Sequence, residues 1–226
     1  MVEEKIIKTL DELAIQYETD KATIYPRSSV HGYAPIYDNI LTPLRDKSIR
    51  MLEVGVCMEG SEGGHSILMW NDYFTKASIY TFDIVDMSLK SCITENDNVF
   101  FYQGDQSNRE HIKNMYQEYG AKEFDFILED GSHEHIHQII SLGKLFEYVK
   151  PGGYYILEDI SIPEHKVCCI RNDETYKILQ HFKETGKIVS EHLLPEEITY
   201  LEKNVQSIEI HHDIQDAYAV AIITKK

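Results

Sequence analysis

The run IRMLEVGV, residues 49–56, decides the fold, because its apolar side chains do not alternate with polar ones along an extended chain. Such a strand is typical of a parallel sheet whose two faces are both covered by helices. Glycines at positions 60, 63 and 64 follow and predict a loop at its carboxyl end. We therefore expect a buried strand of an α/β sheet here.

Strands and helices alternate outward from this run. The further strands expected are 78–84, 98–105, 124–130 and 154–159. The helices expected are 3–16, 35–44, 66–74, 108–119, 134–148 and 173–185. Two last strands, 207–213 and 217–226, are joined by a few polar residues, and so short a connection permits only antiparallel pairing. The expected fold class is α/β, a doubly wound and mostly parallel sheet with an antiparallel C-terminal strand.

The length of 226 residues suits one substantial α/β domain. We expect residues 1–45 to form N-terminal helices and an active-site loop, and residues 46–226 to form one globular unit. The polar stretch 19–33 is neither repetitive nor rich in glycine and serine, so it is interpreted as a functional loop, although a flexible surface loop would fit as well.

The net charge of -16 argues against nucleic acid and against an anionic membrane as partners, because both are met by clustered Lys and Arg. The four cysteines, at 57, 92, 168 and 169, lack structural-zinc spacing and are expected to be reduced thiols. The N-terminus has no signal-peptide core, and no apolar run reaches the roughly 20 residues that span a bilayer. A cytoplasmic protein is expected.

Three strand ends carry residues suited to a ligand. Glu53-Val54-Gly55 leads into the glycine-rich loop, but Cys57 stands where a dinucleotide motif needs its second glycine. Asp83 ends the next strand, where an acidic residue accepts hydrogen bonds from ribose hydroxyls, and Gly104-Asp105-Gln106 ends the third. Each alone is equally explained as a turn or a cap, whereas three in register predict a cofactor site.

A carboxylate cluster is expected where the fourth and fifth strands end. Asp130 closes the one strand, and Glu158 and Asp159 close the other. Three carboxylates brought together repel unless a cation neutralises them, and oxygen ligands suit Mg²⁺, Mn²⁺ or Ca²⁺. His133 follows after a Gly-Ser turn and is a candidate base. The alternative is a set of ordinary helix caps and surface histidines.

With these residues in place, the sequence resembles the metal-dependent sugar O-methyltransferases of macrolide and deoxysugar tailoring. The matching pieces are TDKATIY, HGYAPIYDNIL, PLRDKSIRMLEVGV, GGHSILMW, IYTFDI, QGDQS, EDGSH and KPGGYYILED. The resemblance implies a class I methyltransferase fold, S-adenosylmethionine and Mg²⁺ or Mn²⁺. It implies a cofactor site at Glu53, Gly55, Asp83, Asp105 and Gln106, to which we add Ser66. It also implies metal ligation by Asp130, Glu158 and Asp159, with His133 as the general base.

The function expected is methylation of a sugar hydroxyl, on a small-molecule substrate, by a homo-oligomer. The chain is shorter than the macrolide enzymes, and this favours a nucleotide-linked sugar. His31 and Tyr33 are expected to close over the cofactor or substrate. A catechol O-methyltransferase, a metal-dependent hydrolase and a non-catalytic binding module remain open alternatives.

Overall fold

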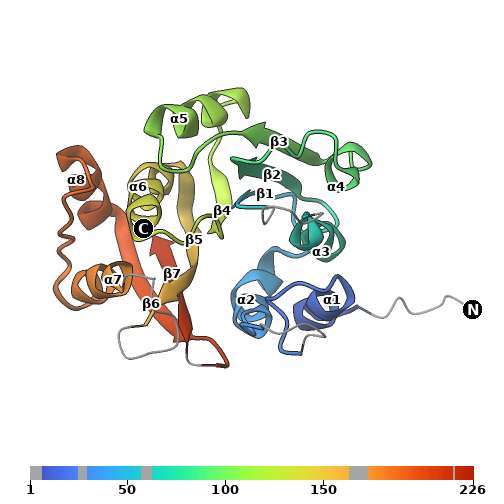
Figure 1. Ribbon diagram of the computed structural model, residues 1–226, viewed down its shortest axis with the longest axis horizontal. Helices are drawn as coiled ribbons and strands as arrows, with labels where there is room; N and C mark the ends of the chain where they lie inside the picture. Colours follow the sequence, from blue (N-terminus) through green and yellow to red (C-terminus); the bar gives the residue numbers. More distant parts are fainter. Residues whose placement is uncertain (1–6, 25–29, 57–62, 163–172, 216) are drawn as a thin grey trace, which may run out of the picture.

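The computed structural model describes residues 7–24, 30–56, 63–162, 173–215 and 217–226. They form one seven-stranded sheet in the order β3-β2-β1-β4-β5-β7-β6 (Figure 1). The strands are β1 Arg50–Val54, β2 Ser78–Asp83, β3 Val99–Gln103, β4 Phe124–Glu129, β5 Val149–Ser161, β6 Val205–His212 and β7 Tyr218–Lys225. β1 pairs in parallel with both β2 and β4, so the run that was expected to be buried lies inside the sheet.

Helices cover both faces of the sheet (Figure 1). They are α1 Leu10–Gln16, α2 Ala34–Leu41, α3 His65–Tyr73, α4 Ser91–Thr94, α5 Arg109–Glu118, α6 His135–Leu145, α7 Glu174–Thr185 and α8 Pro195–Asn204, with short 3-10 turns at Thr42–Leu44 and Phe146–Tyr148. Each face has its own apolar core. One core joins Leu52 to α5–α8, and the other joins Met51 to α1–α4. The two cores follow from the strand geometry, since successive side chains point to opposite faces.

The first helix is shorter than expected. Thr9 caps it, because its hydroxyl accepts the backbone N–H of Glu12 at 3.2 Å while Glu12 Oε2 accepts the N–H of Thr9 at 2.8 Å. This reciprocal pair starts a helix at Leu10. Ile7, which was expected inside the helix, precedes it and is 73% exposed. Residues 3–6 of the expected helix lie outside the described residues.

The C-terminal part confirms the expected antiparallel ending and adds a helix that was not expected. β7 pairs antiparallel with β5 on one side and with β6 on the other. α8 precedes β6, with Pro195 in its first turn and Glu196 and Glu197 beside it. Proline and acidic residues are typical of a helix start, so a signal for α8 was present in the sequence. None of the helices described is long and apolar enough to cross a membrane.

Candidate functional site

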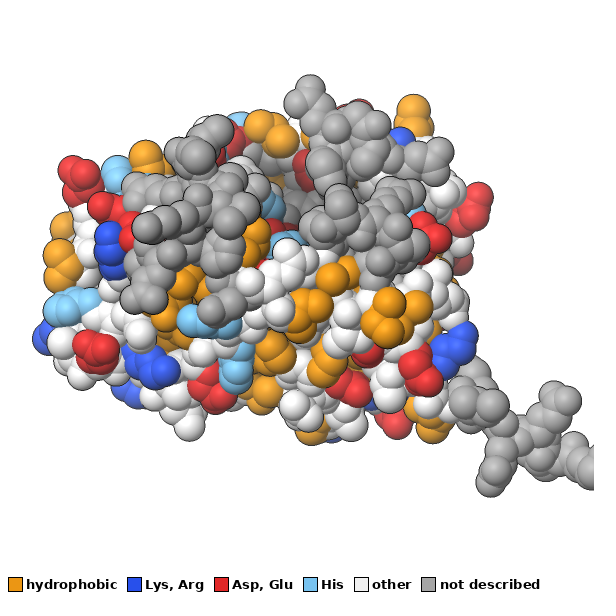
Figure 2. All heavy atoms as spheres, turned by 60° about the horizontal axis from the view of Figure 1, so that its bottom comes forward, with side chains coloured by type: hydrophobic (Ala, Val, Ile, Leu, Met, Phe, Trp, Pro, Cys, Tyr) orange, Lys and Arg blue, Asp and Glu red, His pale blue; other side chains and the backbone are white. Residues whose placement is uncertain are grey.

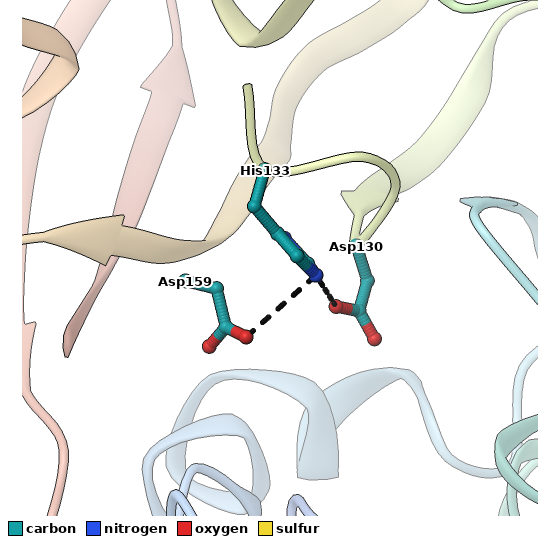
Figure 3. A group of neighbouring side chains, drawn as sticks. All are labelled: Asp130, His133 and Asp159. Carbon is teal, nitrogen blue, oxygen red and sulfur yellow. Dashed lines mark ion pairs between the residues drawn. The ribbon is translucent and has the colours of Figure 1, made fainter. Parts of the chain in front are cut away.

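Three side chains meet where β4 and β5 end (Figure 3). Asp130 directly follows β4, His133 lies in the loop to α6, and Asp159 lies in β5. One ligand atom from each falls within 4.8 Å of the others. His133 Nε2 lies 3.9 Å from Asp130 Oδ1 and 3.7 Å from Asp159 Oδ2. The two carboxylates offer oxygen ligands that fit a divalent cation, and the imidazole lies close enough to exchange a proton with a group bound there.

The backbone at these strand ends departs from regular geometry. His133 and Asp159 have positive φ angles of 57° and 53°, which residues other than glycine rarely adopt. The pairing of β5 with β7 also shifts between Leu157 and Ile160. Such an irregularity re-aims side chains. As a result the neighbours Glu158 and Asp159 both contact the N-terminal segment, which lies beneath the cluster in Figure 3.

Lys21 places a buried ammonium group beside the carboxylates. Its Nζ lies 2.5 Å from Asp130 Oδ2 and 3.1 Å from Glu158 Oε2, and the side chain is 2% exposed. Tyr37 donates its hydroxyl to Glu158 Oε1 at 2.6 Å. Glu158, expected as a metal ligand, is therefore held by Lys21 and Tyr37 and lies outside the group formed by Asp130, His133 and Asp159.

Burial dominates the electrostatics of this cluster. Burial and then the nearby Asp130 raise the pKa of Glu158 well above its ordinary value, although Lys21 opposes the rise. Burial raises the pKa of Asp130 as well, against the lowering influence of Lys21. A divalent cation would favour the ionised carboxylates that burial disfavours.

His31 and Tyr33, expected near the substrate, contact the same strand end. Tyr33 donates its hydroxyl to Asp159 Oδ1 at 3.2 Å, and His31 Nδ1 lies 3.6 Å from that oxygen. His31 Nδ1 also lies 3.2 Å from Oδ2 of the buried Asp213, in the turn between β6 and β7. Residues 30–33 are thereby tied to the sheet. Residues 25–29 of the expected loop lie outside the described residues.

Two acidic groups lie at the ends of β1 and β2. Asp83 is buried, so it is not a solvated aspartate, and it accepts the backbone N–H groups of Val56 at 2.6 Å and Val85 at 2.8 Å. Glu53 is fully buried, and neither of its oxygens has a hydrogen-bond partner among the described residues. Burial raises its pKa to about 7. An orphaned buried carboxylate fits a cationic ligand group, which the sulfonium and ammonium of S-adenosylmethionine would supply.

Ser66 lies in the first turn of α3, near Glu53. Its hydroxyl and the indole N–H of Trp70 lie close enough to lower the pKa of Glu53 somewhat, but neither reaches hydrogen-bond geometry. The indole N–H is itself buried and has no hydrogen-bond partner in the part of the chain that the structure describes. The role of Ser66 in binding the cofactor stays a prediction. Cys57 and Gly60 of the expected loop lie outside the described residues.

Gly55 and Gly131 let the ends of β1 and β4 approach closely. A Cβ on Gly55, whose φ is +85°, would lie 2.0 Å from the carbonyl oxygen of Asp130. A Cβ on Gly131 would lie 1.7 Å from Oε1 of Gln106. That oxygen accepts the N–H of Ser132 at 2.8 Å, and Gln106 Nε2 donates to Glu129 at 2.7 Å. Gly55 and Gln106 thus position the loop that carries Asp130 and His133.

The side chain of Asp105 closes a local turn. It accepts the N–H and the hydroxyl of Ser107 at 2.8 and 2.7 Å. Asp130, in contrast, does not cap α6, because the N-cap residue there is Glu134 and the Asp130 carboxylate faces Lys21 and His133. The alternative of simple helix caps therefore does not account for Asp130. The face brought forward in Figure 2 contains a hollow with acidic and histidine side chains inside it.

Sequence comparison finds O-methyltransferases of natural-product sugars among the relatives of this chain. Over 153 residues, 67% of this chain and 36% of the relative, the sequence is 35% identical to mycinamicin VI 2''-O-methyltransferase of Micromonospora griseorubida. With the same coverage it is 32% identical to 8-demethyl-8-(2-methoxy-alpha-L-rhamnosyl)-tetracenomycin-C 3'-O-methyltransferase of Streptomyces olivaceus. No family model matches the sequence.

A solved structure extends the likeness to nearly the whole chain. It is MycE methyltransferase from the mycinamycin biosynthetic pathway, in complex with Mg, S-adenosylhomocysteine (SAH) and mycinamycin VI. The TM-score is 0.73 at 26% sequence identity, over 97% of this chain and 55% of that one. The chain is homologous to the sugar O-methyltransferases of natural-product biosynthesis. It spans only 36% of the length of these sequence relatives.

These findings confirm the expected resemblance and the class I methyltransferase fold. The expected cofactors agree with the Mg and SAH bound in the MycE structures. The roles of the individual site residues stay predictions. Lys21, Tyr37 and Asp213 were not expected at the site. The first two lie within the quoted pieces TDKATIY and HGYAPIYDNIL, so the resemblance pointed to their segments without identifying their contacts.

Proposed function

We propose that this chain carries the catalytic site of an S-adenosylmethionine-dependent and Mg²⁺-dependent O-methyltransferase that acts on a sugar hydroxyl. The observation that carries the proposal is the cluster of Asp130, His133 and Asp159 near the carboxyl ends of the neighbouring strands β4 and β5 in a class I methyltransferase sheet. The orphaned carboxylate of Glu53 at the neighbouring strand end supports the cofactor. The names of relatives that include rhamnosyl and olivosyl groups support the sugar.

The metal would be held by Asp130 and Asp159, with Glu158 as the third ligand expected from the resemblance. A divalent cation supplies Lewis-acid chemistry, which lowers the pKa of a coordinated hydroxyl. S-adenosylmethionine supplies the methyl group. Asp83 would accept hydrogen bonds from the ribose hydroxyls, while Glu53 would pair with a cationic group at the methionine end.

His133 would remove the proton from the reacting hydroxyl at Nε2, the nitrogen that points into the cluster (Figure 3). Asp130 and Asp159 lie close enough to that nitrogen to stabilise the imidazolium that forms. Tyr33 and His31 would hold Asp159 in place from the opposite side. We also propose that the protein is cytoplasmic and forms a homo-oligomer. The preferred substrate is a nucleotide-linked sugar or a glycosylated natural product.

Methyl transfer measured by mass spectrometry tests this proposal. Purified protein is offered nucleotide-activated sugars and glycosylated natural products, with S-adenosylmethionine and Mg²⁺. We expect transfer that stops in excess EDTA and returns with Mg²⁺. His133→Asn should lower kcat at least about a hundredfold, in line with the loss of a general base. His181→Asn, on the exposed surface of α7, is the matched control. Full transfer in EDTA would remove the metal from the mechanism, and a failure to bind SAH in calorimetry would remove the cofactor.

A further inference from the structure

Lys21 is fixed by the fold although it lies in the connection between α1 and α2. Its own carbonyl accepts the N–H of Ala34 at 2.8 Å, and the carbonyl of Asp20 accepts the N–H of His31 at 2.8 Å. These bonds tie its backbone to the segment that begins α2. The side chain extends into the core and ends between β4 and β5. A lysine that is buried to this degree is rare unless its charge is paired.

The ammonium group meets an excess of negative charge. Asp130 and Glu158 contact it directly, and Asp20 Oδ1 lies at 3.7 Å. Lys21 thus pairs with carboxylates that would otherwise repel one another.

Lys21 contacts two carboxylates that are expected to bind the metal. Lys21 forms an ion pair with Oδ2 of Asp130, while Oδ1 of the same carboxylate faces His133. On Glu158, Lys21 contacts Oε2 and the Tyr37 hydroxyl donates to Oε1. Each oxygen of Glu158 therefore already contacts one of these two groups. A metal ion that approaches Oε2 of Glu158 comes close to the Lys21 ammonium, whose positive charge repels it, whereas the Tyr37 hydroxyl carries no charge.

We propose that Lys21 is a positioning residue for the metal site, whose ammonium neutralises Asp130 and Glu158 in the metal-free protein and competes with the divalent cation for them. This inference rests on the proposed function, since it takes these carboxylates as metal ligands. Its consequence is twofold. The site stays assembled without metal, and the affinity for the metal is lower than the same carboxylates would give without the ammonium.

Lys21→Met tests both consequences, because methionine fills the space of the stem and carries no charge. In excess EDTA we expect its melting temperature to fall by on the order of 10 °C, as for a buried pair that has lost one partner. Mn²⁺ should restore most of this loss. The affinity for Mn²⁺, followed by electron paramagnetic resonance of the free ion, should be at least about tenfold higher than in the wild type. Lys150→Met, which removes the half-exposed ion pair with Asp125, is the control.

The outcomes separate this inference from the proposed function. Equal losses of melting temperature with and without Mn²⁺ would make Lys21 a structural ion pair only, and an unchanged or lower Mn²⁺ affinity would show that it does not compete. A variant that is recovered folded only with Mn²⁺ is the extreme form of the expected result, and one that is unfolded under both conditions overturns the inference. If the Mn²⁺ results hold but no sugar is methylated, the proposed substrate is wrong and the role of Lys21 stands.

Discussion

Glu53→Gln should change stability and cofactor binding in opposite directions. Glu53 is fully buried, and burial raises its pKa from 4.5 to about 7. In the unfolded chain the carboxyl ionises around pH 4.5, whereas in the folded protein it holds its proton until about pH 7. The folded state therefore binds more protons between these values, and stability falls as the pH rises through this window.

The magnitude follows from the same pKa values. Ionised Glu53 costs the folded state about 3 kcal/mol above pH 7 and almost nothing below pH 4.5, since each pKa unit corresponds to about 1.4 kcal/mol. Glutamine carries no charge at any pH. The difference in unfolding free energy between Glu53→Gln and the wild type should therefore be larger at pH 8 than at pH 5, by up to about 3 kcal/mol in favour of the variant.

Urea unfolding of the ligand-free protein at the two pH values measures this difference. Other titrating groups, including Glu129, are present in both proteins and cancel in the comparison. Glu118→Gln, on the exposed side of α5, is the matched control. Calorimetry should show that Glu53→Gln binds S-adenosylmethionine at least about tenfold more weakly, because a buried charge pair is lost. An equal change in stability at both pH values would refute the assigned protonation of Glu53.

Two further predictions concern the loop before α6 and the anchoring of α8. Gly55→Ala should lower the free energy of unfolding in urea by about 3 kcal/mol or more, because its Cβ would lie 2.0 Å from a backbone oxygen. Gly152→Ala, at a similar φ but in open space, should lower it by about 1 kcal/mol. Equal losses in the two variants would rule out the clash. Arg109→Met should cost about 1–3 kcal/mol, since it leaves the buried Glu197 without two 2.7 Å hydrogen bonds, and the exposed Lys113→Met should cost less than about 0.5 kcal/mol. A loss from Arg109→Met no greater than that from Lys113→Met would contradict the assigned role.

Much of the fold could be predicted because it depends on local patterns. Apolar runs without alternation gave the parallel strands, and the short link between the last two strands gave their antiparallel pairing. The carboxylates at strand ends followed from topology, since parallel strands bring their carboxyl ends to one edge. α8 was not predicted, although Pro195 and the two glutamates that follow it are typical of a helix start.

The charge arrangement at the site could not be predicted in the same way. Nothing in the neighbourhood of Lys21 in the sequence shows that its side chain is buried, because Asp130 and Glu158, which it contacts directly, lie more than a hundred positions away. Asp213 likewise joins His31 across 182 positions. The register shift in β5, which accompanies the contacts of both Glu158 and Asp159 with the N-terminal segment, depends on pairing with β7. Tertiary contacts of this kind leave no periodicity in the sequence.

The N-terminal segment completes the site electrostatically as well as covering it. Lys21, Tyr33 and Tyr37 each bring a donor to a carboxylate of β4 or β5, and the two tyrosines also lie in the apolar core that α1 and α2 share with the sheet. Without these donors, Asp130, Glu158 and Asp159 would face one another at the end of a buried sheet, and their repulsion would oppose folding. The N-terminal segment, residues 7–24 and 30–45, and the sheet therefore stabilise each other. The sheet supplies the apolar surface on which the segment packs, and the segment supplies the groups that neutralise the carboxylates. The expected division at residue 45 separates elements in sequence, whereas the chemistry of the site needs both sides of it.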